Sequence, residues 1–226
     1  MAKIVTDGLI LAADAASKRS YESGTSWYDL SSSNLTGTLT NGPTSSSLNG
    51  GYIQLDGTND YVDFGNDVTT PALPFSVSCW VRFDAVDAND PIFDSSYDAS
   101  SYYGFWVQKA TDNLVKCHYG DGTGGGTADR RGKYGTTTLV ADTWYHISCV
   151  WRGATDMSIY INGVDDGGTH DGSGGALAYG SSKPARIGVV KSNYAGIKIP
   201  QLLVYSKGLT KDEVLQNYYA TRGRFV

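Results

Sequence analysis

The sequence has few cysteines, and they are not arranged for a known cysteine chemistry. Its 3 cysteines, Cys79, Cys117 and Cys149, lie far apart in apolar runs, with no CxxC pair and no clustered histidines. Zinc sites use local cysteine pairs, and disulfide frameworks use more cysteines in a shorter chain. We therefore predict three buried free thiols and folding in a reducing cytoplasm.

Long hydrophobic runs are also missing. No window reaches the roughly 18 apolar residues of a membrane helix. The first residues, MAKIVTDGLILAADAA, hold only a short apolar stretch that Asp7 interrupts, which is unlike a signal peptide. The sequence thus predicts no membrane insertion and synthesis without a signal peptide.

Positive charge is scarce and dispersed. The chain carries 18 Lys and Arg against 23 Asp and Glu, a formal net charge of -5. Nucleic-acid binding needs a concentrated basic face, so we expect no nucleic-acid partner. The one tight basic group, Arg130, Arg131 and Lys133, falls in a Gly-rich stretch and is predicted to be a solvated loop.

Small, hydroxyl and tyrosine side chains are abundant instead. Gly, Ser and Thr number 28, 23 and 20, and there are 16 Tyr and 21 Asp but only 2 Glu. Strand and turn formers therefore exceed helix formers. Apolar and polar residues alternate, and turn residues recur about every eight to twelve positions. This predicts an all-β fold, a two-sheet antiparallel β-sandwich, as one domain over residues 1–226 with an N-terminal arm at 1–7.

The clearest predicted strand is Phe75–Phe83, whose apolar odd-numbered residues share one face. Asn162-Gly163 is the strongest hairpin signal. The Ser/Thr-rich segment Ser17–Gly50 is predicted to be a long ordered loop. Further strands are expected at Gly8–Leu11, Tyr52–Leu55, Tyr61–Phe64, Pro91–Asp94, Tyr102–Gln108, Asn113–Tyr119, Trp144–Arg152, Met157–Ile161, Arg186–Val190 and Gly196–Tyr205.

One helix is predicted, over residues 210–221. Thr210 and Glu213 form a capping box, in which each side chain accepts from the other residue's backbone N–H. Val214, Leu215, Tyr218 and Tyr219 follow at helical spacing. We expect this helix to pack against the sandwich.

Six sequence blocks follow one another along the chain: Asp56–Val62, Phe75–Val81, Trp144–Ile147, Ile159–Gly163, Ile187-Gly188 and Leu202–Val214. In this order they resemble the blocks of laminin G-like, concanavalin A-like lectin jelly rolls. The resemblance extends from about Gly8 to Phe225, and it implies a jelly-roll sandwich.

The two ends of the chain carry a narrower resemblance. The opening segments Gly8–Tyr21, Gly24–Leu30, Gly37–Leu39 and Asn41–Pro43, with the closing segment Gln216–Phe225, look like laminin G-like structural proteins of tailed bacteriophages. This implies a virion surface location, as a capsid decoration protein, a head fibre or a tail-associated adhesin. Such a protein is made in the host cytoplasm and released on a particle.

Catalytic motifs are absent from the sequence. Glucanases that resemble this fold carry two glutamates in an E-x-D-x-x-E pattern, and glycoside hydrolysis needs two carboxyl groups flanking the sugar bond. The chain has no such run, no G-x-S-x-G elbow and no phosphate-binding loop. His146 and Cys149 are three residues apart on a predicted strand and so face opposite sides. We predict that the protein is not an enzyme and has no catalytic residues.

Calcium is the one cofactor that the sequence leaves open. Related folds hold calcium at a sandwich rim, and Ca²⁺ takes six to eight oxygen ligands. Two acidic sets could supply part of a shell, and acidic turns are the alternative interpretation. The sets are Asp87, Asp90 and Asp94, and Asp165, Asp166 and Asp171.

A carbohydrate site needs aromatic faces beside polar groups. If Phe105 and Cys117 point into the core, then Tyr102, Trp106 and His118 point outward. We predict these three as a carbohydrate-binding patch. The alternative is that the outward Trp106 packs under a loop or against a neighbouring subunit.

Together these inferences predict a non-enzymatic virion surface protein that also binds carbohydrate. The expected partners are capsid or tail proteins, cell-surface glycans and other copies of the chain. Attachment would use Met1–Asp7, Ser17–Gly50 or a sheet face. The alternatives are a soluble lectin-like carbohydrate-binding module and a polysaccharide hydrolase or lyase on the same scaffold.

Overall fold

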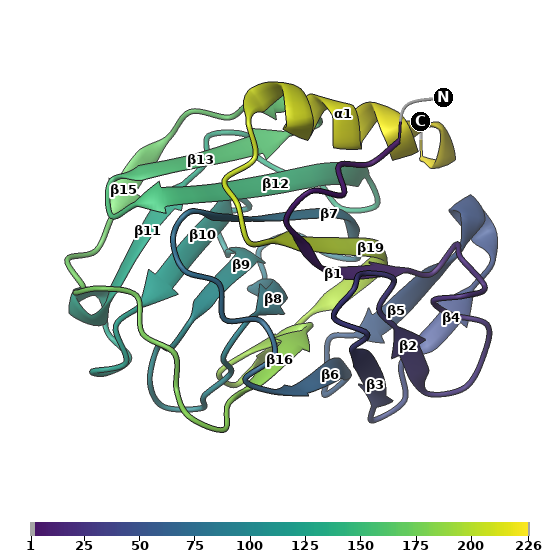
Figure 1. The fold of residues 1–226 in the computed structure, drawn as a ribbon, viewed down its shortest axis with the longest axis horizontal. Coiled ribbons are helices and arrows are strands. Elements are labelled where there is room, and N and C mark those ends of the chain that lie inside the picture. The colour runs from purple at the N-terminus through teal and green to yellow at the C-terminus, as the bar shows by residue number, and fades with distance from the viewer. Residues whose placement is uncertain (1–2, 226) are drawn as a thin grey trace.

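The computed structural model describes residues 3–225 and contains two large antiparallel sheets that stack face to face (Figure 1). Met1, Ala2 and Val226 lie outside the described residues, so the predicted N-terminal arm is seen only from Lys3 onward. This architecture confirms the predicted all-β sandwich with one short helix. No helix among residues 3–225 has the length and apolar character needed to cross a membrane.

Sheet A is one layer of the sandwich. Its strands, in spatial order, are β14 (Val164–Asp165), β13 (Asp156–Ile161), β12 (Trp144–Gly153), β7 (Phe75–Phe83), β19 (Gly196–Tyr205), β5 (Tyr52–Asp56) and β4 (Thr44–Ser46), with β1 (Leu9–Asp14) also paired to β19. Long strands β7, β12 and β19 form its centre.

Sheet B is the facing layer. Its strands, in spatial order, are β15 (Thr169–Asp171), β11 (Arg130–Tyr134), β10 (Val115–Gly120), β9 (Phe105–Lys109), β8 (Asp90–Asp94), β16 (Pro184–Ile187), β6 (Tyr61–Asn66), β3 (Thr36–Thr40) and β2 (Ser26–Tyr28). A separate hairpin pairs β17 (Val189–Val190) with β18 (Asn193–Tyr194). Short 3-10 turns cover Leu48–Gly50, Thr127–Asp129 and Arg222–Arg224.

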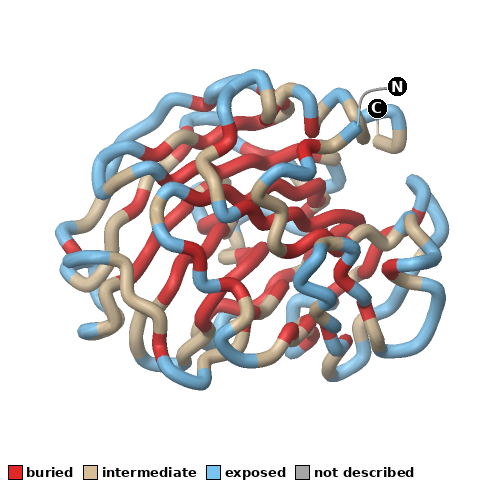
Figure 2. The backbone as a smooth tube through the Cα atoms, in the orientation of Figure 1, coloured by how far each residue is buried: buried red, intermediate tan, exposed pale blue. Residues whose placement is uncertain are grey.

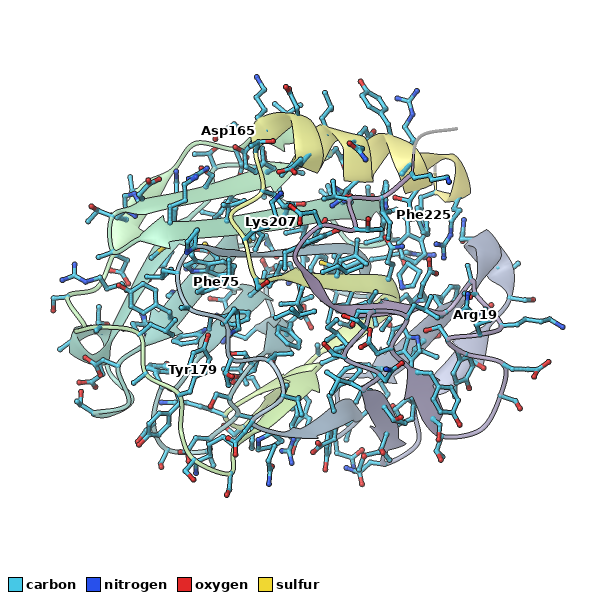
Figure 3. The ribbon with its side chains drawn as sticks, viewed as in Figure 1. Arg19, Phe75, Asp165, Tyr179, Lys207 and Phe225 are labelled. Atoms are coloured by element: carbon cyan, nitrogen blue, oxygen red, sulfur yellow. The ribbon has the colours of Figure 1, made fainter. Side chains whose placement is uncertain are left out.

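The main core lies between the sheets, where the strands run through the buried interior (Figure 2). Phe75 of β7 packs on Phe105 of β9 and on Trp151 of β12, with ring centroids 4.3 and 4.9 Å apart. Phe105 also meets Tyr179, and Figure 3 shows Phe75 and Tyr179 on the same side of the molecule. Burying each such side chain contributes roughly 1.5–3 kcal/mol.

The three cysteines are buried and free, as predicted. Cys79, Cys117 and Cys149 all belong to the core between the sheets. Burial raises the pKa of the Cys79 thiol to about 12, so this thiol stays protonated and unreactive at neutral pH.

The predicted loop Ser17–Gly50 is wrong in part, because it contains β2, β3 and β4. Trp27 and Leu39 are buried there, and most of the polar residues between them are exposed. Short strands with one apolar side chain each give almost no alternation signal. The basic group Arg130–Lys133 is likewise not a loop. It lies in β11 near the margin of sheet B, where both strand faces can be polar.

Turn chemistry is as predicted at the hairpin between β13 and β14. Asn162 and Gly163 have φ angles of 52° and 80°, both in the left-handed region that a type I′ turn requires. The turn joins Ile161 to its partner Val164.

Helix α1 (Lys211–Thr221) covers the outer face of sheet A, meaning the face turned away from sheet B. Thr210 caps it and accepts from the Glu213 N–H, which confirms the predicted capping box. Beneath the helix a second apolar cluster includes Val5, Tyr160 and Val214. In Figure 1, α1 lies beside β12 and β13, and the two chain ends lie next to each other.

Candidate functional site

The outer face of sheet B gathers polar and aromatic side chains from strands far apart in sequence. In antiparallel sheets, directly opposed residues project to the same face. One such row crosses all nine strands through Asp171, Gly132, His118, Trp106, Asp94, Arg186, Asp63, Thr38 and Ser26. The register of the sheet therefore places a histidine, a tryptophan, three carboxyls and a guanidinium in one row.

The three residues predicted as a carbohydrate patch are brought together in one stack. The ring centroids of Tyr102 and Trp106 are 4.6 Å apart with an interplanar angle of 17°, and those of Trp106 and His118 are 4.9 Å apart at 18°. Trp106 and His118 are each 2% exposed, whereas Tyr102 is half-buried. Tyr102 is thus the member of the stack that reaches the surface.

His118 forms the buried end of this stack, and its imidazole ring is uncharged. Gly132 lies opposite it, and a side chain at that position would clash with the imidazole. Burial lowers the pKa of His118 to about 3, so the ring is neutral at physiological pH. Neither ring nitrogen has a hydrogen-bond partner within residues 3–225, which leaves the ring to act by stacking.

Next to the stack, Arg186 of β16 lies between two tyrosine rings. Its guanidinium carbon is 4.6 Å from the ring centroid of Tyr61 and 4.3 Å from that of Tyr97. Its Nε donates to Asp63 Oδ2 at 2.9 Å. These contacts hold the guanidinium in a fixed orientation on the outer face.

Two carboxyls near Arg186 have opposite protonation behaviour. Burial raises the pKa of Asp94 to about 8, although Arg186 and the Ser96 N–H oppose that shift. The Lys183 ammonium and the surrounding hydroxyl and amide donors hold the pKa of Asp98 well below its usual range. At neutral pH Asp94 is a hydrogen-bonding acid and Asp98 is an ion paired with Lys183. Asp94 is 5% exposed, so its carboxyl is shielded from solvent.

Neither acidic set proposed for calcium converges on one point. Asp90 forms an ion pair with Lys109, whose Nζ lies 2.9 Å from Asp90 Oδ2 and also donates to the Ala88 carbonyl. Asp94 Oδ1 accepts a hydrogen bond from the Ser96 N–H at 2.9 Å. The Lys109 ammonium thus takes the place that a cation would occupy beside Asp90.

The second acidic set is divided in the same way. Asp166 accepts from Thr136 and Thr137, and Asp171 pairs with Arg130 and accepts from Tyr134. Across residues 3–225 there is no group of three or more His, Cys, Asp or Glu side chains placed to hold a metal ion.

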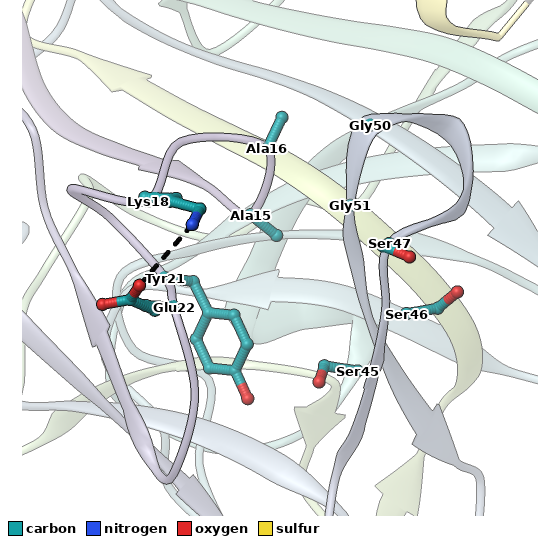
Figure 4. Close-up of a pocket in the computed structure, with 10 residues that line it drawn as sticks. All are labelled: Ala15, Ala16, Lys18, Tyr21, Glu22, Ser45, Ser46, Ser47, Gly50 and Gly51. Atoms are coloured by element: carbon teal, nitrogen blue, oxygen red, sulfur yellow. Dashed lines mark ion pairs between the residues drawn. The ribbon is translucent and has the colours of Figure 1, made fainter.

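A groove of about 340 Å³ lies at the edge of the sandwich, between the loop after β1 and strand β4 (Figure 4). Tyr21 and Ser45 line it, and the exposed ion pair of Lys18 and Glu22, with Nζ and Oε1 3.7 Å apart, stands at its rim. One ring and several hydroxyls in a hollow of this volume suit a small polar ligand. Sequence reasoning missed this groove because it placed the whole segment in a loop.

A Ser–His pair beneath α1 was also missed. Ser78 Oγ and His146 Nε2 are 3.0 Å apart, and Ser78 Oγ also bonds Ser148 Oγ at 2.8 Å. The pair joins the neighbouring strands β7 and β12 of sheet A, so only the register of the sheet reveals it. Both residues are buried under the helix, and burial lowers the pKa of His146 to about 3. As predicted, Cys149 lies on the opposite face from His146, in the core.

Two stacked antiparallel sheets with this connectivity define a lectin-like jelly roll. The chain belongs to the laminin G-like group of the concanavalin A-like lectin/glucanases superfamily, whose family model matches residues 56–215. No curated protein matches the chain.

Solved structures of the same fold share little sequence with this chain. The receptor binding domain of botulinum neurotoxin C/D mosaic serotype has a TM-score of 0.70 at 14% identity, over 95% of this chain and 52% of that one. The binding domain of Paraclostridial Mosquitocidal Protein 1 has a TM-score of 0.69 at 14% identity, over 93% and 52%. Trypanosoma rangeli sialidase, solved with sialic acid, has a TM-score of 0.65 at 13% identity, over 100% and 35%. The chain thus spans about half or less of these proteins, and the likeness is one of fold.

Proposed function

We propose that the chain is a non-catalytic glycan-binding module, carried on the virion surface of a tailed bacteriophage as a decoration or fibre protein. The observation that supports glycan binding is the outer face of sheet B, where aromatic rings, hydroxyls and fixed charges from distant segments meet. Sugar sites combine aromatic surface with a few convergent polar groups. On sheet A, α1 covers the part of the outer face that holds Trp80 and His146.

Within this face we place the glycan at Tyr102, with Trp106 and His118 as its support. Tyr102 is half-buried, and the Trp106 ring stacks on it with centroids 4.6 Å apart. Gln108, half-buried and opposite Lys116 on the same face, adds amide donors and acceptors. Binding would therefore be polar and edge-on rather than through a free aromatic face.

The virion location rests on the resemblance of both chain ends to phage structural proteins. In the fold these ends pack together: Val5 N–H donates to Asn217 Oδ1 at 2.8 Å, and the Gln216 amide donates to the Lys3 carbonyl at 2.8 Å. They lie on the side of sheet A, so attachment there would leave sheet B free. Capsid or tail proteins, and other copies of the chain, are the partners in this proposal.

Glycan binding is tested on a glycan array with the purified chain and three variants. Tyr102→Ala should lose the signal. Tyr28→Ala, which removes a 50%-exposed tyrosine from edge strand β2, is the matched control and should keep it. Tyr21→Ala tests the groove of Figure 4. Loss of signal only in Tyr21→Ala would move the site to the groove, and silence of the wild-type chain would reject glycan binding.

The virion location is tested by co-sedimentation with phage particles. The chain should pellet with capsids or tails and stay in the supernatant without them. A chain that binds glycans but never sediments with particles would support the soluble lectin-like module instead.

One observation favours a hydrolase as the second candidate. Asp94 and Asp98 lie close enough for the Asp98 charge to raise the pKa of Asp94, and such divergent pairs supply an acid and a base in glycosidases. Asp98 is held by Lys183 and by the Ser100 and Ser101 N–H groups, which leaves it little freedom to act. Release of reducing ends from a bound polysaccharide, abolished by Asp94→Asn, would establish this candidate.

A further inference from the structure

Cations and tyrosine rings alternate across the outer face of sheet B. Four cations each lie on a tyrosine ring, with distances to ring centroids between 3.9 and 5.4 Å. We call these eight residues the cation–tyrosine belt: Tyr61, Arg186, Tyr97, Lys191, Tyr102, Arg130, Tyr134 and Lys116. They come from β6, β16, β11, β10 and two loops, so the belt exists only in the folded chain.

Hydrogen bonds join its segments into one continuous surface. The Tyr97 hydroxyl donates to the Lys191 carbonyl at 2.9 Å. Arg130 donates to the hydroxyls of both Tyr102 and Tyr134, at 3.4 Å each. All eight belt residues are half-buried. Their cations are therefore positioned before any ligand arrives, which lowers the entropy cost of binding.

Lys191 differs from the other three cations in its charge balance. Arg186 pairs with Asp63, Arg130 with Asp171 and Lys116 with Asp112, at 2.9, 3.3 and 2.7 Å. Among residues 3–225, no carboxylate lies within 4.0 Å of the Lys191 ammonium. Its contacts are the Gly125 carbonyl at 3.1 Å and the Tyr102 ring at 3.9 Å. Together with the three carboxylates that pair with its other cations, the belt therefore carries one net positive charge, at Lys191.

The backbone at Lys191 supports a specific role for this side chain. Lys191 has a φ of 53° in the turn between β17 and β18, a conformation in which asparagine or glycine is favoured over lysine. The turn nevertheless presents a lysine, and this places the ammonium on Tyr102.

The occupied ring faces restrict what can bind. Trp106 covers one face of Tyr102 and Lys191 the other, so neither a pyranose nor a nucleic-acid base can stack there without displacing a partner. Three cations already face carboxylates, which leaves too little positive charge for a nucleic-acid backbone. A sugar chain with spaced carboxylate groups matches one uncompensated ammonium beside partly balanced guanidinium groups.

We propose that the cation–tyrosine belt binds an acidic polysaccharide, with Lys191 as the residue that selects a negatively charged sugar over a neutral one. This inference rests on the proposed glycan-binding function and specifies its ligand class.

The test measures affinity by calorimetry for three carboxylate-bearing polysaccharides: polygalacturonate, hyaluronate and polysialic acid. Dextran and carboxyl-reduced polygalacturonate are the neutral controls. We expect binding of at least one acidic polymer, weakened by added salt because the charges at the surface are screened. Lys191→Gln should weaken this binding about tenfold. Lys211→Gln, which changes an exposed lysine of α1 on the side of sheet A, is the control and should change nothing.

A second variant separates charge from folding. Lys191→Asn removes the ammonium and suits the left-handed backbone, so it should match or exceed the wild-type melting temperature while binding acidic polymers about tenfold more weakly. Wild-type affinity in this variant would overturn the proposal. Equal binding of acidic and neutral polymers would also overturn it while leaving glycan binding intact. Tighter binding of single-stranded DNA would overturn it as well, and binding to no polymer or array glycan would reject the proposed function too.

Discussion

The two outer faces of the sandwich are both built from strands with alternating residues, but they differ in how far the chain itself covers them. On sheet A, the outward residues beneath α1 include Ser78, Trp80, His146 and Ser148, and neutral hydrogen bonds tie them together and to the helix, such as that from Trp80 Nε1 to Thr221 Oγ1 at 2.7 Å. On sheet B the outward residues include arginine, lysine, aspartate and half-buried tyrosine. The comparison shows that the uncharged residues beneath α1 are covered by the chain itself, whereas the arginines, lysines and tyrosines of the belt on sheet B are only half-buried and can contact a partner.

The largest expected effect is on the free energy of unfolding, which should fall far more for a substitution beneath α1 than for one on the outer face of sheet B. Trp80 stacks on Phe225, at 4.3 Å between centroids, and on Tyr218; Figure 3 shows Phe225 near the end of α1. Trp80→Ala should lower the free energy of unfolding by about 3–5 kcal/mol and leave polysaccharide affinity unchanged. Tyr102→Ala should cost only about 1–2 kcal/mol and abolish that affinity. Urea unfolding and calorimetry test both, and a reversed pattern would show that the faces are misassigned.

The pH dependence of stability sharpens the comparison. Burial lowers the pKa of His146 to about 3 from a usual 6.5, so the unfolded chain takes up a proton that the folded chain refuses. The stability from this histidine is full above pH 6.5 and is lost as the pH falls toward 3, at up to about 1.4 kcal/mol per pH unit. His146→Asn should flatten the slope measured by urea unfolding at pH 7, 6 and 5. An unchanged slope would mean that α1 does not keep water from His146.

Asp94 on the other face should act in the opposite direction. Its pKa is raised from 3.8 to about 8, so the folded chain holds a proton that the unfolded chain has released. Its contribution to stability is present below pH 4 and declines as the pH rises toward 8. Asp94→Asn should therefore be neutral at pH 4 and stabilising at pH 7, by an amount on the order of 1 kcal/mol. Destabilisation at pH 7 would show that the ionised carboxylate is the native form.

The smallest effect concerns the edge of the belt. Lys116 and Asp112 are 2.7 Å apart, and Asp112 is largely open to solvent. Lys116→Gln should change the free energy of unfolding by less than about 0.5 kcal/mol and weaken polysaccharide binding less than Lys191→Gln does. A larger loss of affinity from Lys116→Gln would move the centre of the site toward β10.

The sequence predicts the parts of this comparison that depend on local pattern. Strands Phe75–Phe83 and Gly196–Tyr205 have the predicted bounds, and the capped helix begins after Thr210. Strands with a long apolar alternation are identifiable in this way. The strands within Ser17–Gly50 and at Arg130–Tyr134 lack that alternation and were missed.

Of the candidate site, too, only the part that depends on local pattern can be predicted from the sequence. Alternation correctly places Trp106 and His118 on one face, but their stacking with Tyr102 depends on the register of β9 with β10 and on a loop. Arg186 and Lys191 lie more than fifty residues away in the chain from the other belt residues, and no local pattern links them to the belt. Whether an outward tryptophan is covered likewise depends on tertiary packing.

Because the two chain ends lie together, they determine which face of this module points away from an attachment point. Lys3 is bonded to Gln216, and Phe225 stacks on Trp80, both at the side of sheet A. Any fusion partner or tether at either end therefore emerges opposite the belt. A sensor surface that captures the chain by a terminal tag would orient the belt toward the solution, whichever end carries the tag.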